Sequence, residues 1–204
     1  EEGVAAVKER GYASVAGMEC TIFEIAWYVR SMEELFIDQI ERPELAAYLL
    51  DRITERKEFM AGRFAEAGVD VIRFGDDIAT QRGPMMSVSM WREWYKPRLA
   101  RVIQAAKAAN PAVLAMYHSD GQYEPFIDDL IEIGIDILNP IQPECMDPAA
   151  LKAKYGDRAS FWGTVGTQTT MPFGTVQEVR ETVRQRIDTV GRGGGLVIAP
   201  THVL

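Results

Sequence analysis

The chain has few of the residues that build secreted or membrane-spanning proteins. Only two of its 204 residues are cysteines, Cys20 and Cys145, which is too few for a disulfide framework and fits a reduced cytoplasm. No apolar run approaches the roughly 20 residues that cross a bilayer. The segment from Glu1 to Arg10 is charged and does not have the form of a signal peptide. We therefore expect a cytoplasmic protein that is not inserted in a membrane.

Basic residues are also scarce. There are 22 Lys and Arg against 30 Asp and Glu, a formal net charge of -8. An acidic surface repels nucleic-acid phosphates and anionic lipids, so we expect neither as a partner. The 47% of hydrophobic and 25% of charged residues are typical of a globular domain with one core. We interpret residues 1–204 as a single domain and expect it to be part of a longer chain.

Six short apolar runs are predicted to form the strands of a parallel sheet. They are nearly continuously apolar, which is typical of strands buried on both faces. The segments between them carry apolar residues at helical spacing, so repeated strand–helix units with right-handed crossovers are expected. The six runs are Ala13–Met18, Val69–Phe74, Ala112–Tyr117, Asp136–Asn139, Ser160–Gly163 and Leu196–Ala199.

Several positions predict where the helices begin and end, and which side faces the core. Two capping boxes and one Asp-Pro pair are expected at helix starts, and two glycines are expected just past helix ends. The end signals are Ser31 with Glu34, Thr175 with Glu178, Asp147 with Pro148, Gly68 and Gly134. The expected apolar faces are Leu45, Leu49, Ile53, Met60 and Phe64 in one helix, and Val176, Val179, Val183, Ile187 and Val190 in another.

Six strands do not close an eight-stranded barrel, so two α/β folds compete. One is a (β/α)8 TIM barrel of which this chain holds about six units, with the first units and the last helix missing. The other is an open doubly wound sheet. The second fold predicts a glycine-rich phosphate turn after a strand, but GxGxxG and the P-loop are both absent, and Gly191–Gly195 precedes a strand. The barrel is therefore favoured.

Polar residues follow nearly every predicted strand, and the carboxyl ends of parallel strands are where α/β proteins place their sites. The chain has two histidines, and both stand at such ends. Imidazole and carboxylate ligands suit zinc or another divalent metal ion. The predicted metal ligands are His118, Asp120, Glu144 and His202. The alternative is that the two imidazoles bond the substrate without a metal.

Asp76 and Asp77 form a second polar group, after the second strand. Paired carboxylates raise each other's pKa, which suits acid–base catalysis; in the alternative, one of the two caps a helix. We expect Asp76, Asp77, His118 and His202 to be catalytic. The expected substrate contacts are Arg82, which would meet a substrate carboxylate, together with Tyr117, Gln142 and Gln168.

Motifs along the whole chain resemble those of the uroporphyrinogen decarboxylase superfamily. They are Phe74-Gly-Asp-Asp, Trp91-Arg-Glu-Trp-Tyr-Lys-Pro, His118-Ser-Asp-Gly, Asp136-Ile-Leu-Asn-Pro-Ile-Gln-Pro and Gly193-Gly-Gly-Leu-Val-Ile-Ala-Pro-Thr-His. The resemblance implies a (β/α)8 barrel and a homodimer. One branch of the superfamily removes carboxylates from a tetrapyrrole without a cofactor, and its strand-end His matches His202. The serine of that branch is replaced by Asp76, however, and its later strand-end motifs by Asn139-Pro140 and Trp162-Gly163-Thr164.

The other branch comprises corrinoid- and thiol-linked methyltransferases, which bind zinc through a His-x-Cys pair and a distal Cys. The resemblance places His118-x-Asp120, Glu144 and His202 at the corresponding positions, so both thiolates are replaced. An oxygen-and-nitrogen ligand set leaves zinc more Lewis acidic, which suits an ether or amine methyl donor.

We therefore expect an enzyme that moves a methyl group from a small methylated compound to a corrinoid or thiol acceptor. A zinc or other divalent ion would assist, and a corrinoid protein would be the partner. The alternatives are a cofactor-free decarboxylase, with Arg73 and Arg82 among its basic groups, and a barrel that binds a ligand without chemistry.

Overall fold

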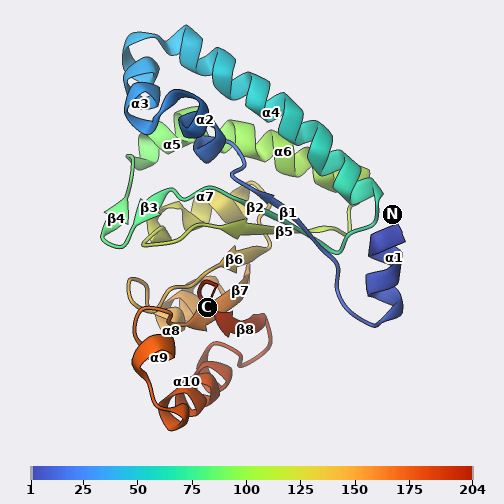
Figure 1. Cartoon of the computed structure of the whole chain (residues 1–204), viewed down its shortest axis with the longest axis vertical. Helices are drawn as coiled ribbons and strands as arrows, with labels where there is room; N and C mark the ends of the chain where they lie inside the picture. The colour runs from blue at the N-terminus through green and yellow to red at the C-terminus, as the bar shows by residue number, and fades with distance from the viewer. Residues whose placement is uncertain (1, 204) are drawn as a thin grey trace.

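The computed structural model describes residues 2–203 and is built on one parallel sheet of six strands (Figure 1). The sheet order is β1-β2-β5-β6-β7-β8, so these six strands stand in the sheet in the same order as in the chain. A separate antiparallel hairpin, β3 with β4, follows β2. The strands are β1 Val15–Glu19, β2 Val71–Gly75, β3 Ala79–Thr80, β4 Gly83–Pro84, β5 Leu114–His118, β6 Ile137–Asn139, β7 Ser160–Val165 and β8 Leu196–Pro200.

Helices connect consecutive strands, as the sequence predicts. They are α1 Glu2–Glu9, α2 Phe23–Arg30, α3 Met32–Glu41, α4 Pro43–Glu66, α5 Val88–Trp94, α6 Lys96–Ala109, α7 Ile127–Glu132, α8 Pro148–Tyr155, α9 Thr170–Phe173 and α10 Val176–Thr189, with a 3-10 turn η1 at Glu124–Phe126. All six predicted strands are present in the predicted order. The first three begin two residues later than expected. Ser14 and Asp70, which directly precede β1 and β2, hydrogen-bond each other through the Asp70 carboxylate.

The two faces of the sheet differ, and the difference distinguishes a barrel wall from a doubly wound sheet. One face packs against the helices, and its side chains, such as Phe74, Tyr117 and Phe161, are fully buried. The other face carries a small separate cluster of Val71, Met116 and Ile137. Within residues 2–203 this face borders a pocket whose lining comes from the strands and from the segment after β8, not from helices. A doubly wound sheet has helices on both faces. The chain therefore has the architecture of six consecutive β/α units of a barrel.

The helix signals are largely confirmed. Thr175 and Glu178 form a complete capping box, and Asp147 accepts hydrogen bonds from two backbone N–H groups of α8. Ser31 accepts from the backbone N–H of Glu34, which is half of its predicted box. Gly68 and Gly134 have φ values of 80° and 101°, as expected for residues that end helices.

The predicted apolar face is largely confirmed in α4 and only partly in α10. In α4, Ile53 is buried and Leu49, Met60 and Phe64 pack against the core, whereas Leu45 is 45% exposed. The buried residues of α4 outside the predicted set are Ala46, Leu50, Thr54, Lys57, Ala61 and Ala65. No residue within α10 is buried, and Val176 is 69% exposed, but Val190, just after the helix, is buried. That helix lies at the end of the sheet (Figure 1), where fewer elements are available to cover it.

The strand register places four residues in one row at the carboxyl ends of the strands. Glu19 pairs with Gly75, Gly75 pairs with His118, and His118 pairs with Asn139. This row forms the rim on which the site is built. β1 and β8 each pair with one neighbour among residues 2–203, so the described strands do not close. No helix in this range is long and apolar enough to cross a membrane.

Candidate metal and substrate site

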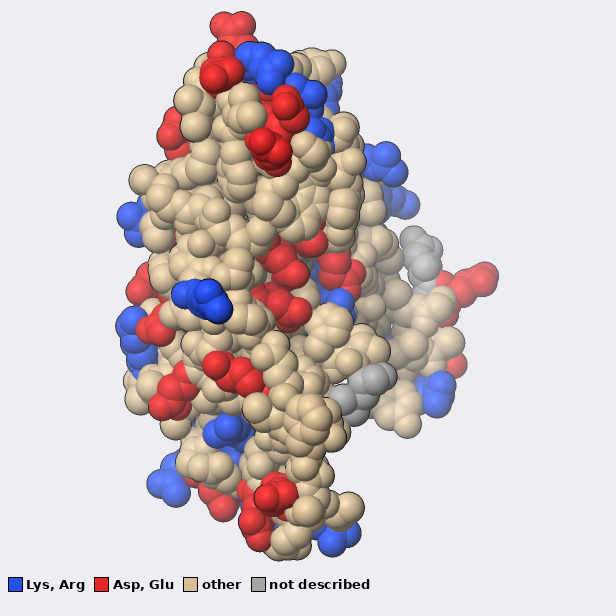
Figure 2. Space-filling view, turned by 60° about the vertical axis from the view of Figure 1, so that its left-hand side comes forward, with Lys and Arg blue, Asp and Glu red and all other residues tan. Residues whose placement is uncertain are grey.

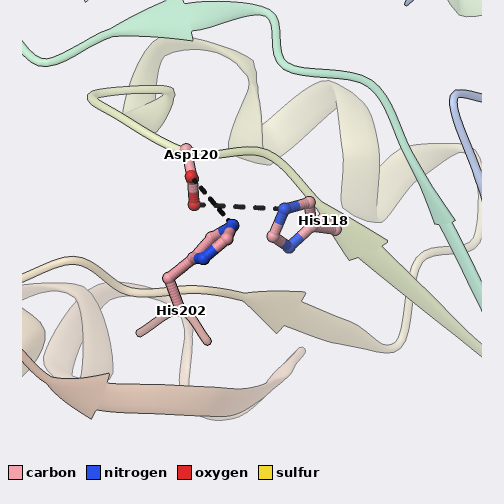
Figure 3. A group of neighbouring side chains, drawn as sticks. All are labelled: His118, Asp120 and His202. Atoms are coloured by element: carbon pink, nitrogen blue, oxygen red, sulfur yellow. Dashed lines mark ion pairs between the residues drawn. The ribbon is translucent and has the colours of Figure 1, made fainter. Parts of the chain in front are cut away.

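The two histidines, predicted from positions far apart in the chain, come together with Asp120 at the strand ends (Figure 3). One ligand atom of each of His118, Asp120 and His202 lies within 4.8 Å of the other two. We call these three residues the His–Asp–His group. His118 ends β5, Asp120 follows it by two residues, and His202 comes just after β8. β6 and β7 lie between β5 and β8 in the sheet, so the sheet must curve to bring His202 to the two residues at the end of β5.

His118 is held in one orientation by Asn139. The Nδ2 of Asn139 donates to the backbone oxygen of Trp162 at 3.1 Å, so its Oδ1 faces the ring. That Oδ1 lies 2.7 Å from Nδ1 of His118, and it can only accept, so the network assigns the imidazole proton to Nδ1. The lone pair of Nε2 is then free, and Nε2 faces Asp120. A metal-binding histidine needs this arrangement.

The Asp120 carboxylate lies between the two rings. Its Oδ1 is 3.9 Å from Nε2 of His118, and its Oδ2 is 3.8 Å from Nε2 of His202. These separations are too long for hydrogen bonds, so the three groups face one another without being bonded. The ring centroids of the two histidines are 6.3 Å apart. The arrangement leaves a space bordered by two nitrogens and a carboxylate.

Glycine at position 75 allows β2 to approach His118 closely. A Cβ at Gly75 would lie 2.8 Å from Cβ of His118 and would collide with the backbone of that residue. Any larger residue would therefore push His118 out of the row. This glycine belongs to the Phe74-Gly-Asp-Asp motif, which ties that motif to the position of the imidazole.

Further carboxylates support the loop that carries Asp120. The backbone N–H of Asp120 donates to Oδ1 of Asp77 at 2.7 Å, and the N–H of Asp77 donates to Glu24 at 3.3 Å. Burial, and then the charge of Asp77, raise the pKa of Glu24. Burial also raises the pKa of Asp120, while the two imidazoles oppose the shift. Figure 2 shows acidic side chains gathered in a hollow near the middle of the face it presents.

Asp76 is buried beneath this rim rather than exposed on it. Its carboxylate accepts hydrogen bonds from the backbone N–H groups of Ile22 and Glu24, where α2 begins. Burial raises the pKa of Asp76 to about 7. The geometry matches the alternative interpretation, in which one aspartate of the pair caps a helix, and the carboxylate does not reach either pocket described below.

Two pockets border the His–Asp–His group, and His202 lines both. The inner pocket, of about 340 Å³, lies on the open face of the sheet and includes Arg73, Met116, His118, Asn139 and Trp162. The outer pocket, of about 290 Å³, is more polar and includes Gln81, Asp120, Gln142, Thr167 and Gln168.

The predicted substrate contacts divide into two groups. Gln142 and Gln168 line the outer pocket, and Gln142 is fixed there by a double amide hydrogen bond with Gln81. Tyr117 points to the helix-covered face, is 1% exposed, and donates to the backbone oxygen of Asp76. It faces away from the pockets because neighbouring strand residues point to opposite faces. Arg82 is exposed at the tip of the β3–β4 hairpin and lines neither pocket.

Glu144, predicted as a fourth metal ligand, does not join the His–Asp–His group. Its Oε1 accepts from the backbone N–H of Gln168 and from the hydroxyl of Thr169. Glu144 lies in the turn that follows β6, and these two hydrogen bonds attach it to the loop after β7. Its other oxygen, Oε2, is buried without a hydrogen-bond partner among the described residues.

Sequence reasoning assigned no role to Asn139, Glu24 or Gln81. Asn139 stands at a strand end, one pairing step from His118, and strand register is the signal that would have identified it. Glu24 lies in a helix after β1, and only the fold shows that it reaches Asp77. Gln81 is recognisable only through its amide pair with Gln142.

The residues of the His–Asp–His group fit a catalytic divalent metal ion. Two imidazole nitrogens and one carboxylate are the three-ligand set of catalytic zinc sites, which leave a further coordination position for substrate. The hydrogen bond from His118 Nδ1 to Asn139 supplies the outer-shell partner that such ligands require. Among residues 2–203, Asp120 makes no hydrogen bond to either imidazole that a metal ion would have to displace.

The fold and site together define a parallel β/α-barrel protein with a polar candidate site at the carboxyl ends of its strands. The sequence model of the uroporphyrinogen decarboxylase (URO-D) family matches residues 3–204. The chain belongs to this family, which confirms the resemblance noted from its motifs.

The curated relatives are methyltransferases. Methylcobamide:CoM methyltransferase MtaA of Methanosarcina barkeri is 25% identical over 186 residues, which cover 91% of this chain and 51% of the relative. The same enzyme of the M. barkeri strain Fusaro / DSM 804 is 23% identical over the same length. The chain thus spans about half the length of these relatives.

Solved structures confirm the fold. A methyltransferase from Methanosarcina mazei superposes with a TM-score of 0.77 at 24% identity, covering 98% of this chain and 56% of that one. A dihydropteroate synthase from Anaplasma phagocytophilum gives a TM-score of 0.52 at 21% identity, covering 91% and 66%.

Proposed function

We propose that this protein transfers a methyl group from a small methylated compound to a corrinoid or thiol acceptor, at a divalent metal ion held by His118, Asp120 and His202. The observation that carries the proposal is the convergence of three ligand atoms within 4.8 Å. The similarity to methylcobamide:CoM methyltransferases supports the reaction class. A corrinoid protein is accordingly the proposed partner.

The ligand set bears on the kind of methyl donor. When bound, a zinc ion with nitrogen and oxygen ligands would act as a Lewis acid on a donor oxygen or nitrogen. His118 and His202 present neutral ring nitrogens to such an ion, and Asp120 supplies the negative charge between them. Asn139 holds the first ring in the required tautomer. These roles favour an O- or N-methylated donor.

The two pockets offer separate places for the donor and the acceptor. Methyl transfer by displacement requires the two partners to approach the carbon from opposite sides, so a site with two chambers suits it. The inner pocket and the outer pocket share Thr201, His202 and Val203, and the rest of their lining residues differ. We assign the small methylated compound to the inner pocket, whose walls include Met116 and Trp162. The outer pocket is left to the acceptor.

A cobalamin assay tests the proposal. The natural-length protein, reconstituted with zinc, is mixed with cob(I)alamin and a panel of O- and N-methylated compounds, and methylcobalamin formation is followed by absorbance. We expect zinc-dependent methylation with at least one donor, and its loss in H202A. R82A, at the hairpin tip outside both pockets, is the matched control and should retain the rate.

Other outcomes would replace the proposal. Conversion of uroporphyrinogen to coproporphyrinogen without added metal would establish decarboxylation instead. Tight binding of a methylated compound, with neither methyl transfer nor decarboxylation, would make the protein a binder.

A further inference from the structure

A cavity distinct from the inner and outer pockets lies away from the His–Asp–His group, between α2 and α4. This groove has a volume of about 430 Å³. Its apolar walls come from Ile25 and Val29 of α2 and from Ile53 and Met60 of α4, and its charged residues are Arg52, Arg56 and Lys57. We call it the α2–α4 groove. The reaction proposed above uses none of these residues.

Lys57 is the unusual residue of the groove. Lys57 is only 8% exposed. Long charged side chains are seldom buried to this extent without a partner. Within residues 2–203, no hydrogen bond or ion pair reaches its ammonium group. The nearby acidic groups Asp76 and Glu19 act on it only at a distance. Burial lowers the pKa of Lys57 as a result.

The charges around Lys57 are mixed. Asp76, Cys20 and Glu19 favour the charge of its ammonium group, whereas Arg56, which is exposed on the rim of the groove, opposes it. Backbone N–H groups at the start of α2 already hold the Asp76 carboxylate, so within residues 2–203 no acidic group pairs directly with Lys57. The charged residues that line the groove are all cationic, and of these Arg52 pairs with Glu55. A lysine that is only 8% exposed and has no direct ion pair would be stabilised by an added anion.

We propose that the α2–α4 groove binds a small organic anion, a carboxylate with a short hydrocarbon body. The carboxylate pairs with Lys57 and Arg56, and the hydrocarbon packs against Ile25, Val29, Ile53 and Met60. This occupant fits both features of the groove: it gives Lys57 the direct ion pair that it does not make within residues 2–203, and it covers apolar side chains such as Val29, which is 68% exposed. A neutral or cationic molecule of the same shape supplies only the second.

Octanoate is the probe that tests this site, and calorimetry on the natural-length protein is the measurement. Octanoate is expected to bind with one site per chain, and octylammonium, which has the same tail and the opposite charge, is expected to bind at least tenfold more weakly. Replacing Lys57 by Met keeps the length and apolar stem of the side chain but removes the charge. Since a hydrogen bond to a charged group contributes about 1.5–3 kcal/mol, K57M should weaken octanoate binding about tenfold or more.

Two further variants sharpen the test. K57R retains a cation in the groove and should retain binding, whereas K154M removes an exposed lysine on α8 and should change nothing. A labelling experiment needs no variant: octanoate should protect Lys57, and not Lys154, from acylation by acetic anhydride, as read by mass spectrometry. The proposal is overturned if octanoate and octylammonium bind equally, or if K57M leaves octanoate affinity within twofold. Absence of octanoate binding, as when another part of the protein covers the groove, overturns it as well.

Discussion

The two ends of strand β2 carry aspartates in opposite circumstances. Asp70 precedes the strand, is partly exposed, and accepts hydrogen bonds from the backbone and hydroxyl of Ser14, which with Lys8 lower its pKa to about 2. Asp76 follows the strand and is buried, and its pKa is raised to about 7. The surroundings at the amino end of β2 therefore favour the charged form of Asp70, whereas those at the carboxyl end disfavour the charged form of Asp76.

The same contrast extends along the rim. At the carboxyl ends, Glu24, Asp77 and Asp120 are linked by backbone hydrogen bonds next to two imidazoles. Like charges gathered in a partly buried place destabilise the folded chain unless a cation joins them. In barrel enzymes the carboxyl ends of the strands carry function and the amino ends carry stability. The difference between Asp70 and Asp76 is a local case of that division.

The largest effect is expected from removing a histidine of the rim. H118A and H202A each delete one of the three proposed metal ligands. Loss of an outer-shell partner lowers metal affinity by up to roughly 100-fold, so loss of a ligand should lower zinc affinity by more than that. Competition with a chromogenic chelator measures this affinity. D70A, at the amino end of β2, should leave the zinc affinity unchanged. An equal loss of zinc affinity in D70A would show that the effect is not specific to the carboxyl ends of the strands.

Replacing Asn139 tests whether the rim holds its ligands in place. N139A frees the ring of His118 and removes the acceptor that fixes its proton on Nδ1, so zinc affinity should fall about 10–100-fold. The matched control is N110A, at the end of α6 and outside the site. If N139A binds zinc as tightly as N110A does, Asn139 does not orient the imidazole.

Replacing Asp76 tests its role as the anchor of α2. D76A leaves the backbone N–H groups of Ile22 and Glu24 buried without their acceptor, which should lower the free energy of unfolding by about 1–3 kcal/mol. Urea denaturation at pH 7 gives the value. A loss of methyl transfer in D76A with unchanged stability would instead restore Asp76 as a catalytic residue.

The pH dependence of stability separates the two aspartates. The pKa of Asp76 rises from 3.8 to about 7 on folding, so between these pH values the folded state binds a proton that the unfolded state does not. The contribution of Asp76 to stability is therefore lost as pH rises from about 4 to 7. The pKa of Asp70 falls from 3.8 to about 2, so its contribution is lost as pH falls from about 4 to 2. D76N should flatten the first slope and D70N the second, and the D70N effect should be the smaller because salt screens an exposed group.

The sequence predicted the architecture well because strand order and strand-end polarity are local patterns. Six apolar runs and the capping signals identified the β/α units, and His118, Asp120 and His202 were predicted from their places after strands. Side-chain direction was harder. Tyr117 faces the helices because it is one residue before His118 in an alternating strand, and Glu144 bonds the following loop.

Other features depend on contacts between distant segments and leave no local pattern. Asn139 reaches His118 through strand register, and Lys57 is buried by the packing of α4 against α2. The helical spacing of large apolar residues in α4 predicted the core-facing side apart from Leu45, but it did not identify the small and polar residues buried there, such as Ala61 and Lys57. Such contacts become predictable only once the neighbours of each element are known.

The central claim is that the carboxyl end of the sheet binds a metal ion between two imidazoles and a carboxylate. Crystals of the natural-length protein grown with zinc, measured on both sides of the zinc absorption edge, test it directly. The account predicts one anomalous peak within about 2.0–2.2 Å of a ring nitrogen of His118, a ring nitrogen of His202 and an oxygen of Asp120. A map with no zinc peak there, or with the two rings turned to different cavities, would contradict it.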